Sequence, residues 1–207
     1  MPRKRNIRQA GQAAAILKLA RRRGVLRPKD LEKSGLPRMA LLRLVKTGRM
    51  QRLGRGLYAV AGHELTEHHD LAEVATRHPR AVVCLLSALR FHGLTTQNPF
   101  EVWIAVGHKD WRPKGGAPPV RVVYMSGQAA AVGIESHTVE GVLVRVFDAA
   151  KTVVDCFRYR NKVGLDVALD ALRDFTRRRR ENPDILWGYA RACRVTRVMR
   201  PYLEALS

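Results

Sequence analysis

Three residues of this chain have the chemical types that could cleave a phosphodiester bond: Asp148, Lys151 and Asp155. Carboxylates and a lysine are groups with which metal-dependent nucleases hold a metal ion and a phosphate. Here they recur at spacings of three and four residues, which places all three on one face of a helix. Such a row favours an Asp–Lys–Asp ladder of salt bridges, and a nuclease remains the weaker alternative.

The other candidate for site chemistry is the run Glu67-His68-His69-Asp70, in which every residue is a possible metal ligand. Adjacent residues of a helix point about 100° apart, so these side chains diverge. We favour a surface helix on which His69 and Glu73 pair at i,i+4. No phosphate-binding loop, dinucleotide fingerprint or nucleophile elbow occurs elsewhere. We therefore expect no catalytic residue, no metal and no cofactor, and interpret the chain as a non-enzyme.

Positive charge is the dominant chemical feature of the chain, whose 207 residues carry a formal net charge of +20. Residues 1–62 contain 17 Lys and Arg against two acids, a net of +15. Residues 63–207 contain 21 against 16, a net of +5. Charge of one sign at this density usually persists because a polyanion neutralises it. The first third of the chain is therefore expected to bind nucleic acid.

Composition also indicates in which cellular compartment the protein acts. Hydrophobic residues make up 46% of the chain, which suffices for a folded core, but no run of about 18 apolar residues could span a bilayer. The three cysteines lie far apart and are expected to be reduced, buried thiols. These features indicate a cytoplasmic protein without a membrane partner.

The elements that must position the N-terminal charge are three helices followed by a hairpin. Apolar periodicity, prolines at helix starts and glycines at helix ends define them. The predicted helices cover residues 7–23, 28–34 and 37–47, and the predicted strands cover 50–53 and 57–60. The strands flank Gly54-Arg55-Gly56, a suitable hairpin turn. This order is typical of a winged helix-turn-helix, which we assign to residues 1–62.

The third helix has the two faces that a DNA-reading helix needs. At about 100° per residue, Leu41, Leu44 and Val45 share the face expected to be buried. The opposite face would enter a major groove about 12 Å wide. We predict DNA contacts from that face, from the hairpin and from a disordered N-terminal arm. They are Arg38, Met39, Leu42, Arg43 and Lys46; Arg52 and Arg55; and Arg3, Lys4 and Arg5.

Residues 63–207 mix helical and strand signals and are assigned to a second domain. The predicted helices cover residues 65–77, 82–91, 149–159, 165–180, 185–193 and 200–206, and the predicted strands cover 101–106, 120–125, 134–138 and 142–147. Glu140-Gly141 suits a hairpin turn. Strands clustered between helical runs predict an α+β domain with a small, mainly antiparallel sheet flanked by helices.

Two further basic segments could make secondary nucleic-acid contacts. The loop over residues 107–119 is longer than most connections. We favour a mobile surface loop whose tryptophan packs on the domain, and stacking of this tryptophan on a nucleotide is the alternative. Four arginines end the helix predicted over residues 165–180, which is more than its dipole needs. The residues concerned are Lys109, Trp111, Arg112, Lys114, Arg177, Arg178, Arg179 and Arg180.

Several segments of the chain, taken in order, resemble AbiEi-type antitoxins. In the N-terminal part these are Gly24-Val-Leu-Arg-Pro-Lys-Asp-Leu, Gly35-Leu-Pro-Arg, Leu44-Val-Lys-Thr-Gly-Arg-Met and Leu53-Gly-Arg-Gly-Leu-Tyr58. In the C-terminal part they are Ser87-Ala-Leu-Arg-Phe-His-Gly-Leu94, Glu101-Val-Trp-Ile-Ala105 and Val146-Phe-Asp-Ala-Ala-Lys-Thr-Val-Val-Asp155. The motifs are degenerate one by one, and their order is the more specific signal.

The resemblance implies a bacterial repressor from a type IV toxin–antitoxin or abortive-infection system. Such antitoxins bind inverted repeats in their own promoter, which requires two protomers on double-stranded DNA. Their partner gene encodes a nucleotidyltransferase-like toxin, which the antitoxin opposes without needing a stable complex. Regulators of the same architecture that lack a toxin neighbour are the alternative within this family.

A general basic protein that coats RNA or DNA without sequence preference is the competing function. The charge of residues 1–62 would suit structured RNA as well as DNA. Recognition of unpaired bases usually uses several stacking aromatics, however, and Tyr58 is the one aromatic residue in this part of the sequence. The residues therefore favour duplex DNA.

Overall fold

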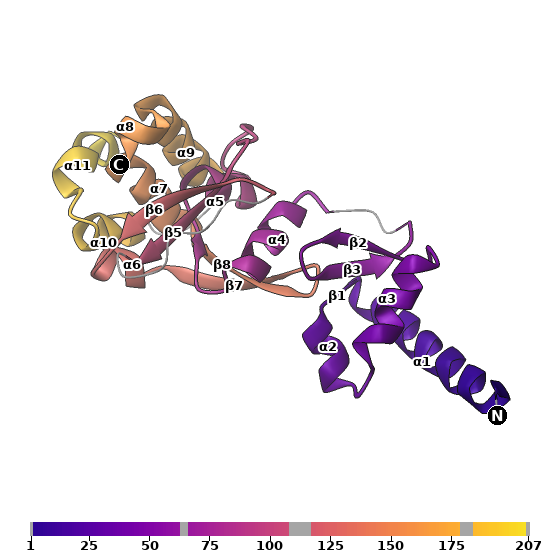
Figure 1. The fold of residues 1–207 in the computed structure, drawn as a ribbon. Coiled ribbons are helices and arrows are strands. Elements are labelled where there is room, and N and C mark those ends of the chain that lie inside the picture. Colours follow the sequence, from indigo (N-terminus) through magenta and orange to yellow (C-terminus); the bar gives the residue numbers. More distant parts are fainter. Residues whose placement is uncertain (1, 63–65, 108–116, 179–183, 206–207) are drawn as a thin grey trace. The chain divides into compact units, whose positions relative to one another are not determined.

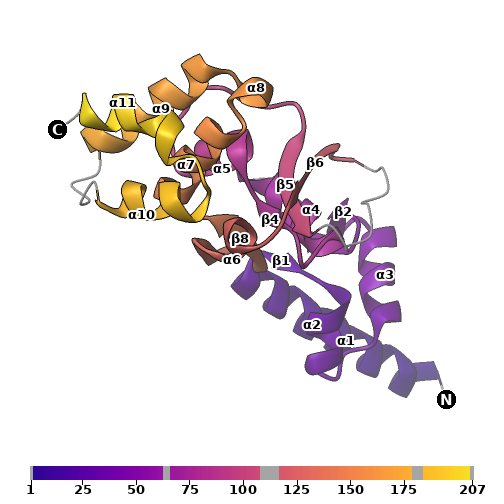
Figure 2. The ribbon, with the colours of Figure 1, turned by 90° about the vertical axis from the view of Figure 1, so that its left-hand side faces the viewer.

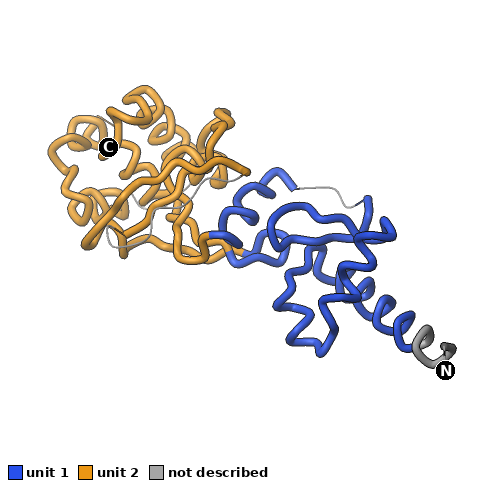
Figure 3. Tube along the Cα trace, viewed as in Figure 1, with its two compact units in different colours: residues 1–77, 138–143 blue, residues 78–137, 144–207 orange. Residues whose placement is uncertain are grey.

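The computed structural model describes residues 2–62, 66–107, 117–178 and 184–205, with side chains described from residue 8 onward except that of residue 178. The chain is α+β, as predicted, and forms two compact units (Figure 3). Residues 1–77 and 138–143 make up the first unit, and residues 78–137 and 144–207 make up the second. The boundary expected after Gly62 falls inside the first unit. A further helix, over residues 69–77, and the chain turn at residues 138–143 pack with the N-terminal elements.

The first unit contains four helices and a three-stranded sheet within the described residues. Its elements are α1 (Pro2–Arg23), β1 (Val25–Leu26), α2 (Pro28–Lys33), α3 (Arg38–Lys46), β2 (Met50–Gly54), β3 (Leu57–Val60) and α4 (His69–Arg77) (Figure 1). The strands are antiparallel in the order β1-β3-β2. β1, which the sequence indicated only as an apolar link, becomes a strand because Val25 and Leu26 pair with Ala59 and Tyr58 of β3.

α1 begins at Pro2, five residues before the predicted start. The disordered arm expected over residues 1–5 is therefore wrong for residues 2–5, whose backbone forms the first turn of this helix. Proline suits a first helical turn because its missing N–H has no intrahelical partner there. Figure 1 shows α1 running from the N-terminus toward the sheet of its unit. Its last turns supply Ile16, Leu17 and Ala20 to the buried core.

The second unit contains a five-stranded sheet and several helices. Its elements are β4 (Val82–Val83), α5 (Leu85–Phe91), β5 (Val102–Gly107), β6 (Val120–Met125), α6 (Gln128–Ala131), β7 (Ile134–Val139), β8 (Val142–Phe147), α7 (Ala149–Arg158), α8 (Arg160–Val163), α9 (Leu165–Arg178), α10 (Asp184–Ala192) and α11 (Thr196–Glu204). The adjoining ends of β7 and β8, within residues 138–143, belong to the first unit. The strand order is β6-β5-β4-β8-β7. Glu140 and Gly141 form the turn between β7 and β8 with φ values of 50° and 73°, as a tight hairpin turn requires.

Two expectations for the second unit are wrong. The sheet is mixed rather than mainly antiparallel, because β4 pairs in parallel with β8 and β5 pairs in parallel with β6. A parallel pair needs a connection of about a dozen residues, which the long segment after β5 supplies. The helix expected over residues 82–91 is in fact a strand followed by α5, since the β-branched Val82 and Val83 occupy the middle of the sheet.

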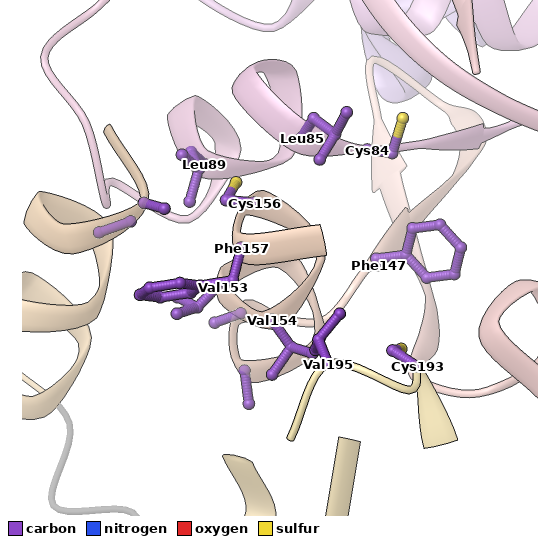
Figure 4. Packing of buried hydrophobic residues seen from close by; sticks show 14 of the residues in the cluster. Cys84, Leu85, Leu89, Phe147, Val153, Val154, Cys156, Phe157, Cys193 and Val195 are labelled. Carbon is purple, nitrogen blue, oxygen red and sulfur yellow. The ribbon is translucent and has the colours of Figure 1, made fainter. Parts of the chain in front are cut away.

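Helix α7 is the centre of the second core. Every residue from Ala149 to Phe157 is buried, and α5, α9, α10 and α11 surround this helix (Figure 2). Figure 4 shows Val153, Cys156 and Phe157 of α7 among the neighbouring apolar side chains. All three cysteines are buried free thiols, as predicted. Within the described parts of the chain, no helix combines the length and apolar character needed to cross a membrane.

The three residues considered for a nuclease site lie on α7 and at its N-terminal cap. Lys151 Nζ lies 2.5 Å from Asp155 Oδ2, and neither side chain has any exposed surface. The ammonium group also lies 4.2 Å from the centre of the Phe147 ring. Asp148 is not the third member of a ladder, because it caps α7 by accepting a hydrogen bond from Lys151 N at 2.7 Å and another from the Tyr189 hydroxyl.

Candidate nucleic-acid interface

α3 separates its side chains cleanly between core and solvent. Ala40, Leu41 and Leu44 are 5% exposed or less and pack with residues of α1, α2, β2 and β3. Val45, predicted to share that face, is only partly buried. The residues predicted to contact DNA from the opposite face are all exposed, and they are Arg38, Met39, Leu42, Arg43 and Lys46. Met39 and Leu42 leave 60% and 41% of their surface in solvent, an unusual position for large apolar side chains.

The positive charges of α3 are not neutralised within their own unit. In the part of the chain that the structure describes, Arg38, Arg43 and Lys46 form no ion pair or side-chain hydrogen bond. No acidic residue occurs anywhere between Lys33 and Gly62. The helix face therefore presents uncompensated cations, which is the arrangement that attracts phosphates.

The turn before α3 is short and firmly held. Gly35 adopts φ 64°, a left-handed conformation that favours glycine at the end of a helix, and Leu36 N donates to Leu31 O at 2.9 Å. Asp30, a buried acid of this unit, accepts hydrogen bonds from Arg27 and pairs with Arg23 at 2.8 Å. Burial raises the pKa of Asp30, but these hydrogen bonds and charges outweigh it and hold the pKa below its ordinary value. The carboxylate is thus neutralised by local partners.

β2 and β3 form a hairpin whose tip is basic. Arg52 and Arg55 are both exposed, and Gly56 turns the chain with φ 78°. The pairing register shifts between Arg52 and Gly54. Arg52 Nε donates to Gly54 O at 3.1 Å, so this guanidinium braces the tip as well as facing solvent.

The other residues predicted to contact nucleic acid lie partly outside the described residues. The backbone of Arg3, Lys4 and Arg5 lies in α1, and their side chains lie outside the described residues. Arg177 is exposed on α9, and Arg178 is the last residue of that helix. Arg179, Arg180 and the loop residues Lys109, Trp111, Arg112 and Lys114 fall outside the described residues.

His69 and Glu73 were predicted to pair on the surface, but His69 is buried and its closer partner is Glu140. His69 is 8% exposed, and its Nδ1 lies 2.7 Å from Glu140 Oε2, whereas its Nε2 lies 4.0 Å from Glu73. Burial raises the pKa of Glu140, but hydrogen bonds from His69 and Thr66 lower it to below its ordinary value overall. Among the described residues, no group of three His, Cys, Asp or Glu could hold a metal ion.

Two features of this surface were missed from the sequence. Glu73 accepts the backbone N–H of Arg55 at the hairpin tip, at 3.3 Å, although 18 residues separate them. Arg49 is exposed three residues after the end of α3 and adds to the positive charge of this surface. Arg49 could have been predicted, because it follows Gly48, the glycine that ends α3. No local sequence pattern indicates the contact between Glu73 and the hairpin.

In the first unit, α1, α2 and α3 pack on a three-stranded sheet and leave one basic face of α3 exposed to solvent. Residues 14–61 match the family described as transcriptional regulator, AbiEi antitoxin. This match confirms the resemblance for the N-terminal segment and covers α3 and the β2–β3 hairpin completely. A comparison with curated proteins finds no match for the chain.

Proposed function

We propose that the protein is a sequence-specific DNA-binding repressor and that its first unit is a winged helix-turn-helix. The observation that carries this proposal is the surface of α3. One face is buried, and the other exposes three uncompensated cations together with two large apolar side chains. Cations alone would serve any polyanion, but exposed Met39 and Leu42 offer apolar contacts to thymine methyl groups in a major groove.

In the proposed complex α3 occupies the major groove and the hairpin is the wing. Arg38 lies at the start of the helix, where recognition helices reach base edges or the nearest phosphate. Arg43 and Lys46 would read bases or bind phosphates further along, and Arg52 and Arg55 would contact the backbone or the minor groove. Repression follows by occlusion of the promoter.

The family match supports a more specific role as the antitoxin of a type IV toxin–antitoxin system that represses its own promoter. In this role two protomers occupy inverted repeats, and a nucleotidyltransferase-like toxin is the functional partner. The free buried thiols are consistent with action in the reducing cytoplasm. We further propose that the basic end of α9 and the loop over residues 107–119 add phosphate contacts.

The test is binding of the purified protein to DNA from upstream of its own gene. A scrambled duplex of equal length and a structured RNA serve as competitors at about 150 mM salt. A repressor should prefer the upstream duplex by roughly 10³-fold or more. Equal affinity for all three ligands would contradict the proposal and support a basic protein that coats nucleic acid.

A further inference from the structure

The tip of the hairpin is held by a carboxylate from α4. Arg55 N donates to Glu73 Oε1 at 3.3 Å. The carboxylate lies so close to Gly54 that a Cβ atom on this residue would come within contact of Glu73 Oε2, well inside the closest real approach of such atoms. One turn further along α4, the Thr76 methyl group lies 3.7 Å from the Cβ position of Gly56. The three residues of the tip therefore rest against α4.

A buried network holds the turn of α4 that precedes Glu73. His69, one turn earlier on α4, lies between Glu73 at 4.0 Å and Glu140 at 2.7 Å. Glu140 also accepts hydrogen bonds from Thr66 N at 3.0 Å and Thr66 Oγ1 at 2.8 Å, and its side chain is 2% exposed. These contacts fix the first turn of α4 to the β7–β8 turn, so the helix that receives the β2–β3 hairpin is held at this end.

The negative charge of Glu73 lies next to a basic surface and reduces its positive charge. The side chain of Glu73 is 12% exposed and stands beside the arginine that would meet a phosphate. Its negative charge lowers the affinity for any polyanion, so simple electrostatics does not explain its position. Its hydrogen bond to the Arg55 backbone does explain it, because that bond sets the direction in which the hairpin tip and its arginines project.

We propose that Glu73 is a positioning residue that locks the wing against α4 and thereby raises discrimination between DNA sequences. This inference rests on the proposed DNA-binding function. Glu73 itself contacts no base or phosphate. It restricts the wing to one orientation, and a wing that is free to move would contact the backbone of any duplex equally well.

The test compares Glu73→Gln with Glu73→Ala in the full chain, using the upstream and scrambled duplexes. Both variants lose the negative charge and should bind both duplexes more tightly. Gln keeps an oxygen that accepts the Arg55 N–H and should keep the wild-type preference, whereas Ala should reduce the preference about tenfold, a loss of the size that one mispositioned contact produces. Asp70→Asn, which removes an exposed charge from the same helix, is the matched control and should leave the preference unchanged.

Gly54→Ala gives an independent test without a change of charge. The added methyl group must displace the Glu73 carboxylate, so the preference should fall as in Glu73→Ala while affinity for the scrambled duplex stays at the wild-type level. Thermal unfolding checks that each variant is folded. If Glu73→Ala and Gly54→Ala both keep the wild-type preference, the proposal is overturned.

Hydrogen exchange of the Arg55 amide separates this proposal from the function on which it rests. In the free protein the amide should exchange faster in Glu73→Ala than in Glu73→Gln, because only the latter retains an acceptor. A wild-type protein that shows no DNA preference would overturn the proposed function and the effect on discrimination. Equal exchange in the two variants would show instead that Glu73 does not hold the wing.

Discussion

Neighbouring residues of α3 have opposite environments, and these environments define what each can do. Leu44 is 4% exposed and contributes to the core, whereas Arg43 projects into solvent without a partner among the described residues. A buried leucine stabilises the helix on its unit, and only the exposed arginine is available to a ligand. Truncation of Arg43 should consequently change DNA binding without changing folding.

We expect Arg43→Ala to weaken binding to the cognate duplex by about 1–3 kcal/mol and to relax the base preference at one position. The reason is the loss of a base-edge interaction made by an exposed guanidinium. Affinities for a panel of duplexes with single base changes would measure both effects. Arg22→Ala, which removes an exposed charge from α1, is the control and should weaken all duplexes alike. A uniform loss for Arg43→Ala would show that this residue binds only phosphate.

The exposure of the predicted α3 and hairpin residues followed from the sequence because it depends on local periodicity alone. A helix bounded by Pro37 and Gly48 with apolar residues at positions 41 and 44 leaves little freedom over which face is buried. The contact of Glu73 with the hairpin could not be found in this way. It depends on how α4 packs against the hairpin, which no pattern within either segment encodes.

At the scale of elements, long amphipathic segments were predictable and very short ones were not. α3 and β3 lie within a residue of their predicted bounds, and β6 and β8 match them. β1 and β4 have two residues each, too few to show a period, and they are strands only because partners from distant parts of the chain pair with them. Tertiary context decided their conformation.

Helix α7 allows a sharp test of how a buried ion pair contributes to its element. Lys151→Met leaves Asp155 buried without its partner and should lower the free energy of unfolding by about 3–5 kcal/mol. The double variant Lys151→Met/Asp155→Leu removes both charges and should recover most of that loss. Urea denaturation at neutral pH measures each value.

The exposed pair between Arg173 and Asp170 on α9 provides the comparison. Their side chains are 65% and 74% exposed and the ion-pair distance is 3.2 Å. Arg173→Ala should cost no more than about 1 kcal/mol, since water and salt screen such a pair. If Lys151→Met proved equally mild, the buried ammonium group would contribute no more to the fold than this surface pair.

At the scale of the whole molecule, the sequence predicted where charge concentrates but not how the chain divides. The excess of positive charge in residues 1–62 required only counting. The division into units depends on contacts such as the one between His69 and Glu140, which lie 71 residues apart, and on the parallel pairing of β5 with β6. Neither has a local signature, because both arise when distant segments pack together.

The charge asymmetry leads to a prediction about α1. Arg3, Lys4 and Arg5 occupy the start of a helix, and alanine is the best helix former, so replacing all three by alanine removes charge while retaining the helix. DNA affinity should fall for every sequence alike. The slope of log K against log salt should become shallower by about 0.9 for each phosphate that the variant no longer neutralises. Titrations of one duplex at several salt concentrations measure that slope.

The control for this titration is Arg197→Ala, an exposed position on α11 of the second unit to which we assign no role in DNA binding; its salt slope should equal that of the wild-type protein. A triple variant with an unchanged slope would show that the first turn of α1 touches no phosphate. In that case the long helix would serve the fold alone through Ile16, Leu17 and Ala20, and the polyanion site would be confined to α3 and the hairpin.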